Sequence, residues 1–157
     1  MNSRRQFLKV AGTGVLAAGF TNALASTETG NLEITEVPFT LGIAGYTFRE
    51  FTIEQTIEIM KRVGVTTLSV KDFHLPYNST KEKIDEVLKK FSDAGITVYT
   101  LGVIYMTTKD FVDQAFNYAK MAGVKMIVAA PNYELLDYVE EKAKTNDIRV
   151  AIHNHGP

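Results

Sequence analysis

The stretch DAGITVYTLGVI, residues 93–104, decides the fold that the sequence predicts. Gly95 is typical of the left-handed residue that ends a helix, and the apolar, β-branched run after it is typical of a buried strand. The same junction of helix end and strand start occurs at residues 63–65, 122–124 and 146–148, the last with Asn146 in place of glycine. Successive glycines of this kind are 31 and 28 residues apart, about the length of one strand-helix unit.

Strand candidates and helix candidates alternate along the chain. The strand candidates are apolar on both faces, as buried parallel strands are; they are residues 39–46, 66–70, 96–104, 125–130 and 148–153. Four apolar stripes with helical spacing lie between them; they are Ile53, Ile57, Met60 and Val63; Ile84, Val87, Leu88 and Phe91; Phe111, Ala115, Tyr118, Ala119 and Ala122; and Leu135, Leu136, Val139 and Ala143. We expect helices to begin at Thr52, in a capping box with Gln55, at Ser79 or Thr80, and at Thr108.

This alternation predicts an α/β fold with a parallel sheet and right-handed crossovers. Two architectures use that plan, the doubly wound sheet and the (β/α)8 or TIM barrel. Residues 42–45 (GIAG) follow the pattern of a phosphate-binding loop only in part, since no third glycine opens a helix after them. The sequence therefore favours TIM-barrel units, with about five strands and four helices and the barrel incomplete.

The first 25 residues have the three parts of an export signal: basic residues, an apolar stretch at 10–20 and a small-residue cleavage site, Ala23-Leu24-Ala25. The segment SRRQFLK, residues 3–9, resembles the twin-arginine translocation signal. A membrane anchor is the alternative, but it needs about 20 apolar residues, more than this stretch has. We expect residues 1–25 to be removed, residues 26–38 to be a flexible lead-in, and the domain to span 39–157.

Export predicts a periplasmic or extracellular protein, and the absence of cysteine means that no disulfide or thiolate metal site contributes to it. Loss of residues 1–25 removes three basic residues and leaves 14 Lys and Arg against 18 Asp and Glu, a net charge of −4. That balance argues against nucleic acid or an anionic membrane as a partner. We expect a small-molecule partner instead.

Chemistry in parallel α/β folds lies at the carboxyl ends of the strands. The polar residues there are Tyr46 and Arg49 after the first strand, Lys71, Asp72 and His74 after the second, and His153, Asn154 and His155 after the fifth. Three segments, LGIAGYTFR (41–49), VKDFHLP (70–76) and VAIHNHGP (150–157), resemble in their order the xylose isomerase-like TIM-barrel family, the sugar phosphate isomerases and epimerases, and specifically its exported members. The resemblance covers residues 39–157, and a complete barrel needs about 250 residues.

The resemblance implies an isomerase or epimerase of sugars or polyols that uses a divalent metal, Mn²⁺, Mg²⁺, Co²⁺ or Zn²⁺. Residues i and i+2 of a strand share a face, so His153 and His155 can both point into the barrel mouth as metal ligands. No carboxylate follows His155, and the metal site is therefore incomplete in this chain. Lys71 and His74 are the catalytic candidates, because an ammonium or imidazole can polarise a carbonyl or hold a substrate phosphate or hydroxyl.

Tyr46 and Asn154 are candidates for substrate contact, although Tyr46 suits a core position equally well, and Lys71 and Asp72 can also pair simply at the surface. Five strands cannot close a barrel, so we expect a truncated part of a longer protein, inactive alone, whose open edges allow self-association. A half-barrel that pairs with its own copy is the alternative. Two other functions stay open: a non-catalytic carbohydrate-binding or degenerate barrel, and a metal-dependent abasic-site nuclease, which the negative charge and the export signal disfavour.

Overall fold

A computed structural model describes residues 39–154 of the chain. The predicted signal, the predicted lead-in and His155 lie outside the described residues. The elements follow one another in the order β1 (Ile43–Ala44), the 3-10 helix η1 (Gly45–Phe48), α2 (Ile53–Val63), β2 (Thr67–Val70), α3 (Lys81–Asp93), β3 (Thr97–Met106), α4 (Lys109–Ala122), β4 (Met126–Pro131), the 3-10 helix η2 (Tyr133–Leu135), α5 (Leu136–Asn146) and β5 (Arg149–Ile152).

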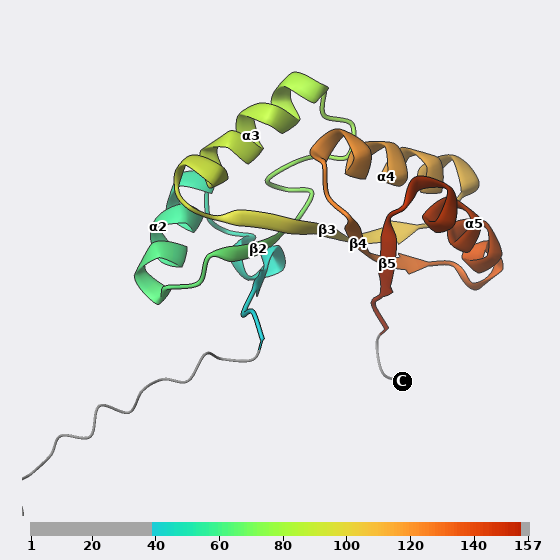
Figure 1. Ribbon diagram of the computed structural model, residues 1–157, viewed down its shortest axis with the longest axis horizontal. Helices are drawn as coiled ribbons and strands as arrows, with labels where there is room; N and C mark the ends of the chain where they lie inside the picture. The colour runs from blue at the N-terminus through green and yellow to red at the C-terminus, as the bar shows by residue number, and fades with distance from the viewer. Residues whose placement is uncertain (1–38, 155–157) are drawn as a thin grey trace, which may run out of the picture. The chain divides into compact units, whose positions relative to one another are not determined.

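The five strands form one parallel sheet in the order β1-β2-β3-β4-β5. Figure 1 labels β2 to β5 of this sheet. Each strand pairs with its neighbour in sequence, and a helix connects each successive pair. This strand order, with one helix per connection, is that of consecutive units of a TIM barrel. The predicted fold class is confirmed.

The helices pack on one face of the sheet, where the core lies. Leu101 pairs with Ile127 and Ile104 pairs with Ala129 across β3 and β4, and all four side chains are fully buried against the helices. Their neighbour Tyr105, one residue along from Ile104, is 52% exposed, because successive side chains of a strand point to opposite faces. The prediction of strands buried on both faces is therefore wrong at Tyr105, but it holds in β2, where the consecutive residues Leu68, Ser69 and Val70 are all buried.

The first strand is shorter than predicted. It comprises Ile43 and Ala44, and the chain then turns into η1 instead of continuing to Tyr46. Gly45 passes so close to β2 that a Cβ on it would lie 2.4 Å from the carbonyl oxygen of Ser69. The apolar residues Phe39 and Leu41 before β1 are exposed, since β1 is an edge strand with a partner on one side only.

Helix starts and stops agree closely with the sequence patterns. Thr52 forms a complete capping box with Gln55, and Thr80 and Thr108 cap α3 and α4. The predicted glycines at 64, 95 and 123 are all left-handed. The fourth helix differs: Asp147, with φ of 52°, takes the left-handed position, and Asn146 stays in α5, where its side chain donates to the carbonyl of Lys142 at 2.6 Å.

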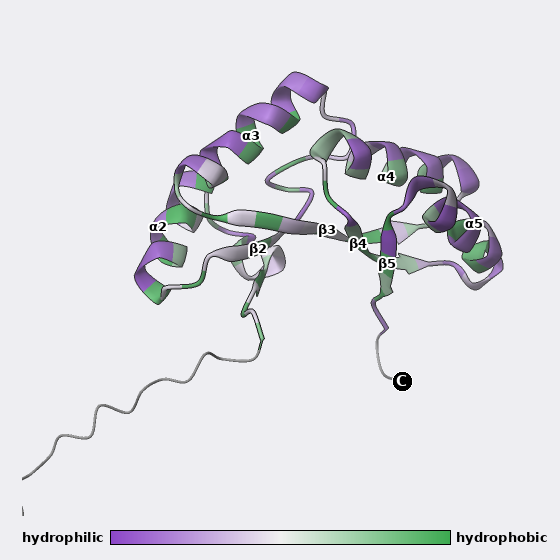
Figure 2. Ribbon diagram, viewed as in Figure 1, coloured by the Kyte–Doolittle hydropathy of each residue, from purple (hydrophilic) through white to green (hydrophobic). Residues whose placement is uncertain are grey.

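Two residues of the predicted apolar stripes are exposed. Val63, the last residue of α2, is 54% exposed, and Leu136, the first residue of α5, is 36% exposed. Both lie at helix ends, where the helix leaves the sheet. Figure 2 shows hydrophilic residues over much of the outward surface of α3, α4 and α5, as expected of helices with one buried face.

Candidate functional site

The site that the fold defines is the edge of the sheet at which the parallel strands end. Lys71 follows β2 directly, and His153 follows β5. The backbone N–H of His153 donates to the carbonyl of Ala129 at 2.8 Å, so the β4–β5 ladder extends to this residue. Lys71 and His153 thus lie at the same edge, on strands that β3 and β4 separate.

Lys71 is the most constrained cation at this edge. Its side chain is 12% exposed, and its ammonium forms a short ion pair with the Asp72 carboxylate. The same ammonium donates to the hydroxyl of Tyr77 at 3.2 Å, and that hydroxyl donates to the backbone carbonyl of Val103, also at 3.2 Å. The hydrogen bonds therefore run in one direction, from the Lys71 ammonium through the neutral Tyr77 phenol to β3.

A bulge in β3 explains why the Val103 carbonyl is available. The β3–β4 pairing passes from Gly102 opposite Val128 to Ile104 opposite Ala129, so Val103 is the extra residue. An extra residue in a bulge leaves the regular ladder, and its backbone groups must find other partners. The Tyr77 hydroxyl is the partner here.

Aromatic packing holds the loop that carries these groups. The Tyr77 ring makes edge-on contacts with Phe111 and Tyr118, at centroid distances of 5.6 and 5.7 Å. Tyr118 is fully buried, and its hydroxyl donates to the carbonyl of Leu75 at 2.7 Å. The loop after β2 is therefore fixed to α4 at two points.

The environment shifts two pKa values in this cluster. Burial lowers the pKa of Lys71, but the hydrogen bonds that its ammonium donates to Asp72 and Tyr77 outweigh this effect, so the pKa of Lys71 lies above its ordinary value. Burial raises the pKa of the Tyr77 phenol, and its hydrogen bond with Lys71 opposes this only in part. Both groups are therefore protonated at neutral pH.

His74, a predicted catalytic residue, occupies a different environment. Its Nε2 lies 2.7 Å from the backbone carbonyl of Phe51, and because a carbonyl only accepts, Nε2 carries the hydrogen. The ring is buried and packs edge-on against Phe73 at 4.7 Å, and its Nδ1 has no hydrogen-bond partner among residues 39–154. His74 thus connects the loop after β2 to the turn before α2. The hydrogen bonds of the Lys71 ammonium go to Asp72 and Tyr77, so the two predicted catalytic residues have different partners.

Tyr46 lies in η1, after β1, and is 60% exposed, so the alternative of a core position is wrong; Phe48 fills the core there. The Tyr46 hydroxyl accepts a hydrogen bond from Arg49 at 2.9 Å, and Arg49 also pairs with Glu50 at 3.2 Å. Lys71 and Asp72 do pair, but with the lysine largely buried instead of at the surface.

Asn154 is exposed at the end of the described residues, and His155, the second predicted metal ligand, lies beyond them. Within residues 39–154, no three His, Asp or Glu side chains gather as a metal site requires. His153 therefore fits a metal only as one member of a set completed by residues outside this range. No helix in the same range is long and apolar enough to cross a membrane.

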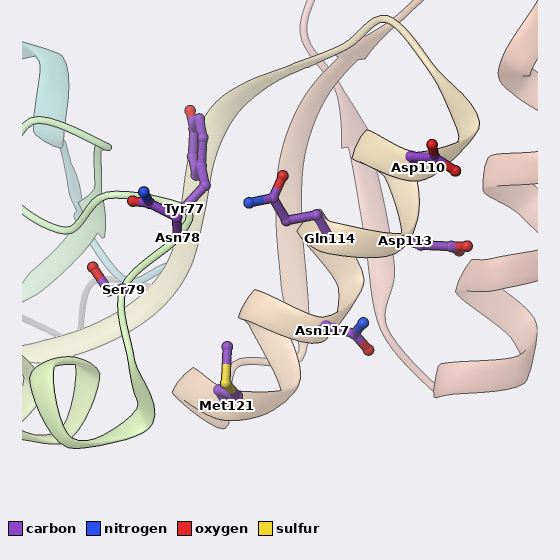
Figure 3. A pocket seen from close by; sticks show the side chains of 8 residues that line it. All are labelled: Tyr77, Asn78, Ser79, Asp110, Asp113, Gln114, Asn117 and Met121. Carbon is purple, nitrogen blue, oxygen red and sulfur yellow. The ribbon is translucent and has the colours of Figure 1, made fainter.

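A polar groove of about 450 Å³ lies beside the strand-end cluster, between the loop after β2 and α4 (Figure 3). Tyr77 and Asn78 line it from the loop, and Gln114 extends toward them from α4. A smaller adjoining hollow shares these three residues and reaches Asp72. Tyr77 thus contacts both the groove and the Lys71 ammonium.

The sequence patterns missed Tyr77. It stands six residues after Lys71, in a loop, and no periodicity or motif marks it. Its role depends on the bulge at Val103, a tertiary feature 26 residues away. The glycine at 102 is the one local sign of that bulge, since glycine inside a strand pattern often marks one.

The fold is similar to that of several solved structures. No protein-family model matches the sequence, and no curated protein matches it. An uncharacterised protein of Parabacteroides distasonis is 26% identical, with a TM-score of 0.67 over 74% of this chain and 53% of its own. A sugar phosphate isomerase/epimerase of the same organism is 17% identical, with a TM-score of 0.54 over 74% of this chain and 51% of its own.

A xylose isomerase domain protein of Planctomyces limnophilus is 14% identical, with a TM-score of 0.52 over 76% of this chain and 55% of its own. This chain spans about half the length of the solved structures that it matches. Two of these structural neighbours are thus named as a sugar phosphate isomerase/epimerase and a xylose isomerase domain protein, and the fold of this chain is that of part of a TIM barrel.

Proposed function

We propose that this chain supplies N-terminal strands of a sugar or sugar phosphate isomerase or epimerase. The observation that carries the proposal is the Lys71 ammonium, which Asp72 and Tyr77 hold at the end of β2. TIM-barrel enzymes bind substrates and place catalytic groups at this edge. The names of two structural neighbours, a sugar phosphate isomerase/epimerase and a xylose isomerase domain protein, support the same class of reaction.

The chemistry of such a reaction suits a fixed ammonium. Isomerisation or epimerisation beside a carbonyl moves a proton and places negative charge on the carbonyl oxygen in the transition state. A pre-positioned N–H donor stabilises that charge without reorganising, which is why such donors contribute strongly to catalysis. Lys71 stays protonated at neutral pH, so its role in this proposal is donor and not base.

The proposal extends to a divalent metal, to a sugar or polyol ligand and to a periplasmic or extracellular location in the full-length protein. Imidazole suits a borderline metal such as Zn²⁺, Mn²⁺ or Co²⁺, and His153 stands at the same edge as Lys71. His153 and His155 are the proposed ligands from this chain. A bound metal would polarise the substrate's oxygens, and the remaining ligands would come from outside residues 39–154.

The test is turnover by the complete reading frame that contains this sequence. Neutral aldoses, ketoses and their phosphate esters are incubated with the protein and Mn²⁺, and products are followed by ¹³C NMR. Lys71→Met is compared with Lys120→Met, which removes an exposed α4 lysine that has no ion pair among the described residues. We expect kcat to fall by about a hundredfold or more in Lys71→Met only. Equal turnover by the two variants would contradict the proposal.

A further inference from the structure

Three residues of neighbouring strands form one row on the face of the sheet that points away from the helices. Tyr105 pairs with Ala130 across β3 and β4. The N–H of His153 donates to the carbonyl of Ala129, which continues the β4–β5 pairing by one residue and places His153 opposite Ala130. The preceding residues Ile104 and Ala129 are buried against the helices, so the side chains of this row point to the other face.

This row lies at the carboxyl ends of the strands. Tyr105 and Ala130 are the last residues but one of β3 and β4, and His153 directly follows β5. In a TIM barrel the face opposite the helices lines the barrel interior, and the carboxyl ends of the strands form the substrate-binding edge. The row is therefore in the layer where a TIM-barrel enzyme contacts its substrate.

The sizes of the three side chains leave the middle of the row low. Adjacent strands are about 4.8 Å apart, so about 10 Å separates the backbones of Tyr105 and His153. Ala130, on the strand between them, places only a methyl group there. A ligand can thus approach β4 at Ala130 with an aromatic ring on one side and an imidazole on the other.

Tyr105 differs from the tyrosines that hold the described chain together. Tyr118 is buried and donates to the carbonyl of Leu75, and Tyr77 donates to the carbonyl of Val103. The Tyr105 ring is 52% exposed, and its hydroxyl has no partner among residues 39–154. The face of an aromatic ring carries partial negative charge and attracts C–H groups, so this ring is suited to contact a ligand.

A sugar offers C–H groups on its faces and hydroxyl groups at its rim. We propose that Tyr105 is a substrate-contacting residue, whose ring packs against the C–H groups of a sugar lying over Ala130 and directs the sugar's oxygens toward His153. This inference rests on the proposed function and adds a residue that orients the substrate. The orientation matters because a metal held by His153 would act on those oxygens.

The experiment measures sugar binding separately from turnover. D-fructose is titrated into the ¹⁵N-labelled complete protein with Mg²⁺, and amide shifts are followed at residues 103–106 and 128–130. Tyr105→Leu is compared with Tyr99→Leu, the matched control, which removes a 39% exposed ring from the other half of β3. We expect Tyr105→Leu to weaken binding by at least about fivefold, and Tyr105→Phe, which keeps the ring, to bind within about twofold of the wild type.

Ala130→Leu tests the same site from the neighbouring strand and covers the case in which Tyr105→Leu fails to fold. The larger side chain fills the space over β4, so we expect binding to weaken by at least about tenfold. Equal affinities of Tyr105→Leu and Tyr99→Leu would overturn the inference, as would a wild type without saturable shifts at these residues. Failure of the isomerase proposal is distinct: sugar binding that requires Tyr105, with no product from any sugar, would overturn that proposal alone.

Discussion

The hydroxyl of Tyr77 bonds the backbone carbonyl of Val103 on one side and the Lys71 ammonium on the other, each at 3.2 Å. One side chain therefore links the bulge in β3 to the cation at the end of β2. Because the hydroxyl both donates and accepts, the link needs a neutral phenol, and burial keeps it neutral by raising the pKa of Tyr77. The position of the proposed substrate donor depends on this link.

Replacement of Tyr77 by phenylalanine removes the link and keeps the ring. The Val103 carbonyl and the Lys71 ammonium each lose a partner, so we expect the free energy of unfolding to fall by about 1–3 kcal/mol. Urea denaturation measures it. Tyr105→Phe is the control, since the Tyr105 ring is 52% exposed and its hydroxyl has no partner among the described residues. Equal stability losses would show that the Tyr77 hydroxyl bonds contribute nothing.

The bulge itself depends on Gly102. Its φ is 133°, and a Cβ there would lie 2.1 Å from the carbonyl oxygen of Val128. We expect Gly102→Ala to lower the free energy of unfolding by more than about 3 kcal/mol, because the β3–β4 backbones must separate. Gly64→Ala is the matched control: its φ is also positive, at 73°, but no atom lies within 4 Å of the added carbon, and its expected cost is about 1 kcal/mol. A Gly102→Ala protein as stable as Gly64→Ala would contradict the observed packing.

His74 has a structural role that is separable from chemistry. We expect His74→Leu to lower the free energy of unfolding by about 1–3 kcal/mol, since the Phe51 carbonyl loses its donor while the apolar contact with Phe73 remains. Thermal unfolding and turnover are measured on the same samples. If His74 is catalytic as the sequence predicts, kcat will collapse in folded protein; if it acts as an anchor only, kcat will follow the folded fraction.

The helix pair α4–α5 should lose stability at acidic pH through Asp113. The Lys142 ammonium and the Tyr138 hydroxyl bond its carboxylate and hold the pKa of Asp113 below its usual range. A carboxyl whose pKa is lower in the folded protein than in the unfolded chain stabilises the fold. Its whole contribution to the free energy of unfolding is present above the pKa in the unfolded chain, about 3.9, and is lost as the pH falls through the pKa in the folded protein. We therefore expect the stability difference between wild type and Asp113→Asn to be constant from pH 7 to about 5 and to shrink toward pH 3.

Urea denaturation at each pH measures that difference. Glu58→Gln is the control, because Glu58 is exposed on α2 and has no ion pair among the described residues. A difference for Asp113→Asn that stays constant down to pH 3 would contradict the assigned pairing.

Metal binding should require His153 in the complete protein. Calorimetry with Mn²⁺ and Zn²⁺ compares wild type with His153→Ala, and we expect affinity to fall by at least about tenfold, the loss typical of disturbing even an outer partner of a ligand. His74→Leu is the matched histidine control, because the His74 ring is buried on the Phe51 carbonyl. Metal affinity that is unchanged in His153→Ala would remove this residue from the proposed ligand set.

Most of the fold could be predicted because local chemistry marks each boundary. A capping threonine begins α2, α3 and α4, and a left-handed glycine follows each of them, so helices and strands could be delimited within a few residues. The bounds of the first strand could not be predicted. Its apolar run predicts a longer strand, but only Ile43 and Ala44 pair with β2. Edge pairing is a tertiary property that a single segment does not encode.

The site was only partly predictable for the same reason. Lys71 and His153 could be found because both follow apolar runs directly. Tyr77 could not, since its role depends on a carbonyl released by the β3 bulge. His74 stands at a strand end as a functional histidine would, and only the structure shows its ring on the Phe51 carbonyl.

The most direct test of the account is to map where a neutral sugar binds on the ¹⁵N-labelled complete protein. Amide shifts during titration with an unphosphorylated ketose identify the edge of the sheet that the ligand contacts. The account predicts saturable shifts in the loops at the carboxyl ends of the strands, residues 45–52 and 71–79, and their loss in Lys71→Met. Shifts confined to the opposite edge, at residues 64–66, 94–96 and 123–125, or no shifts with any sugar, would contradict it.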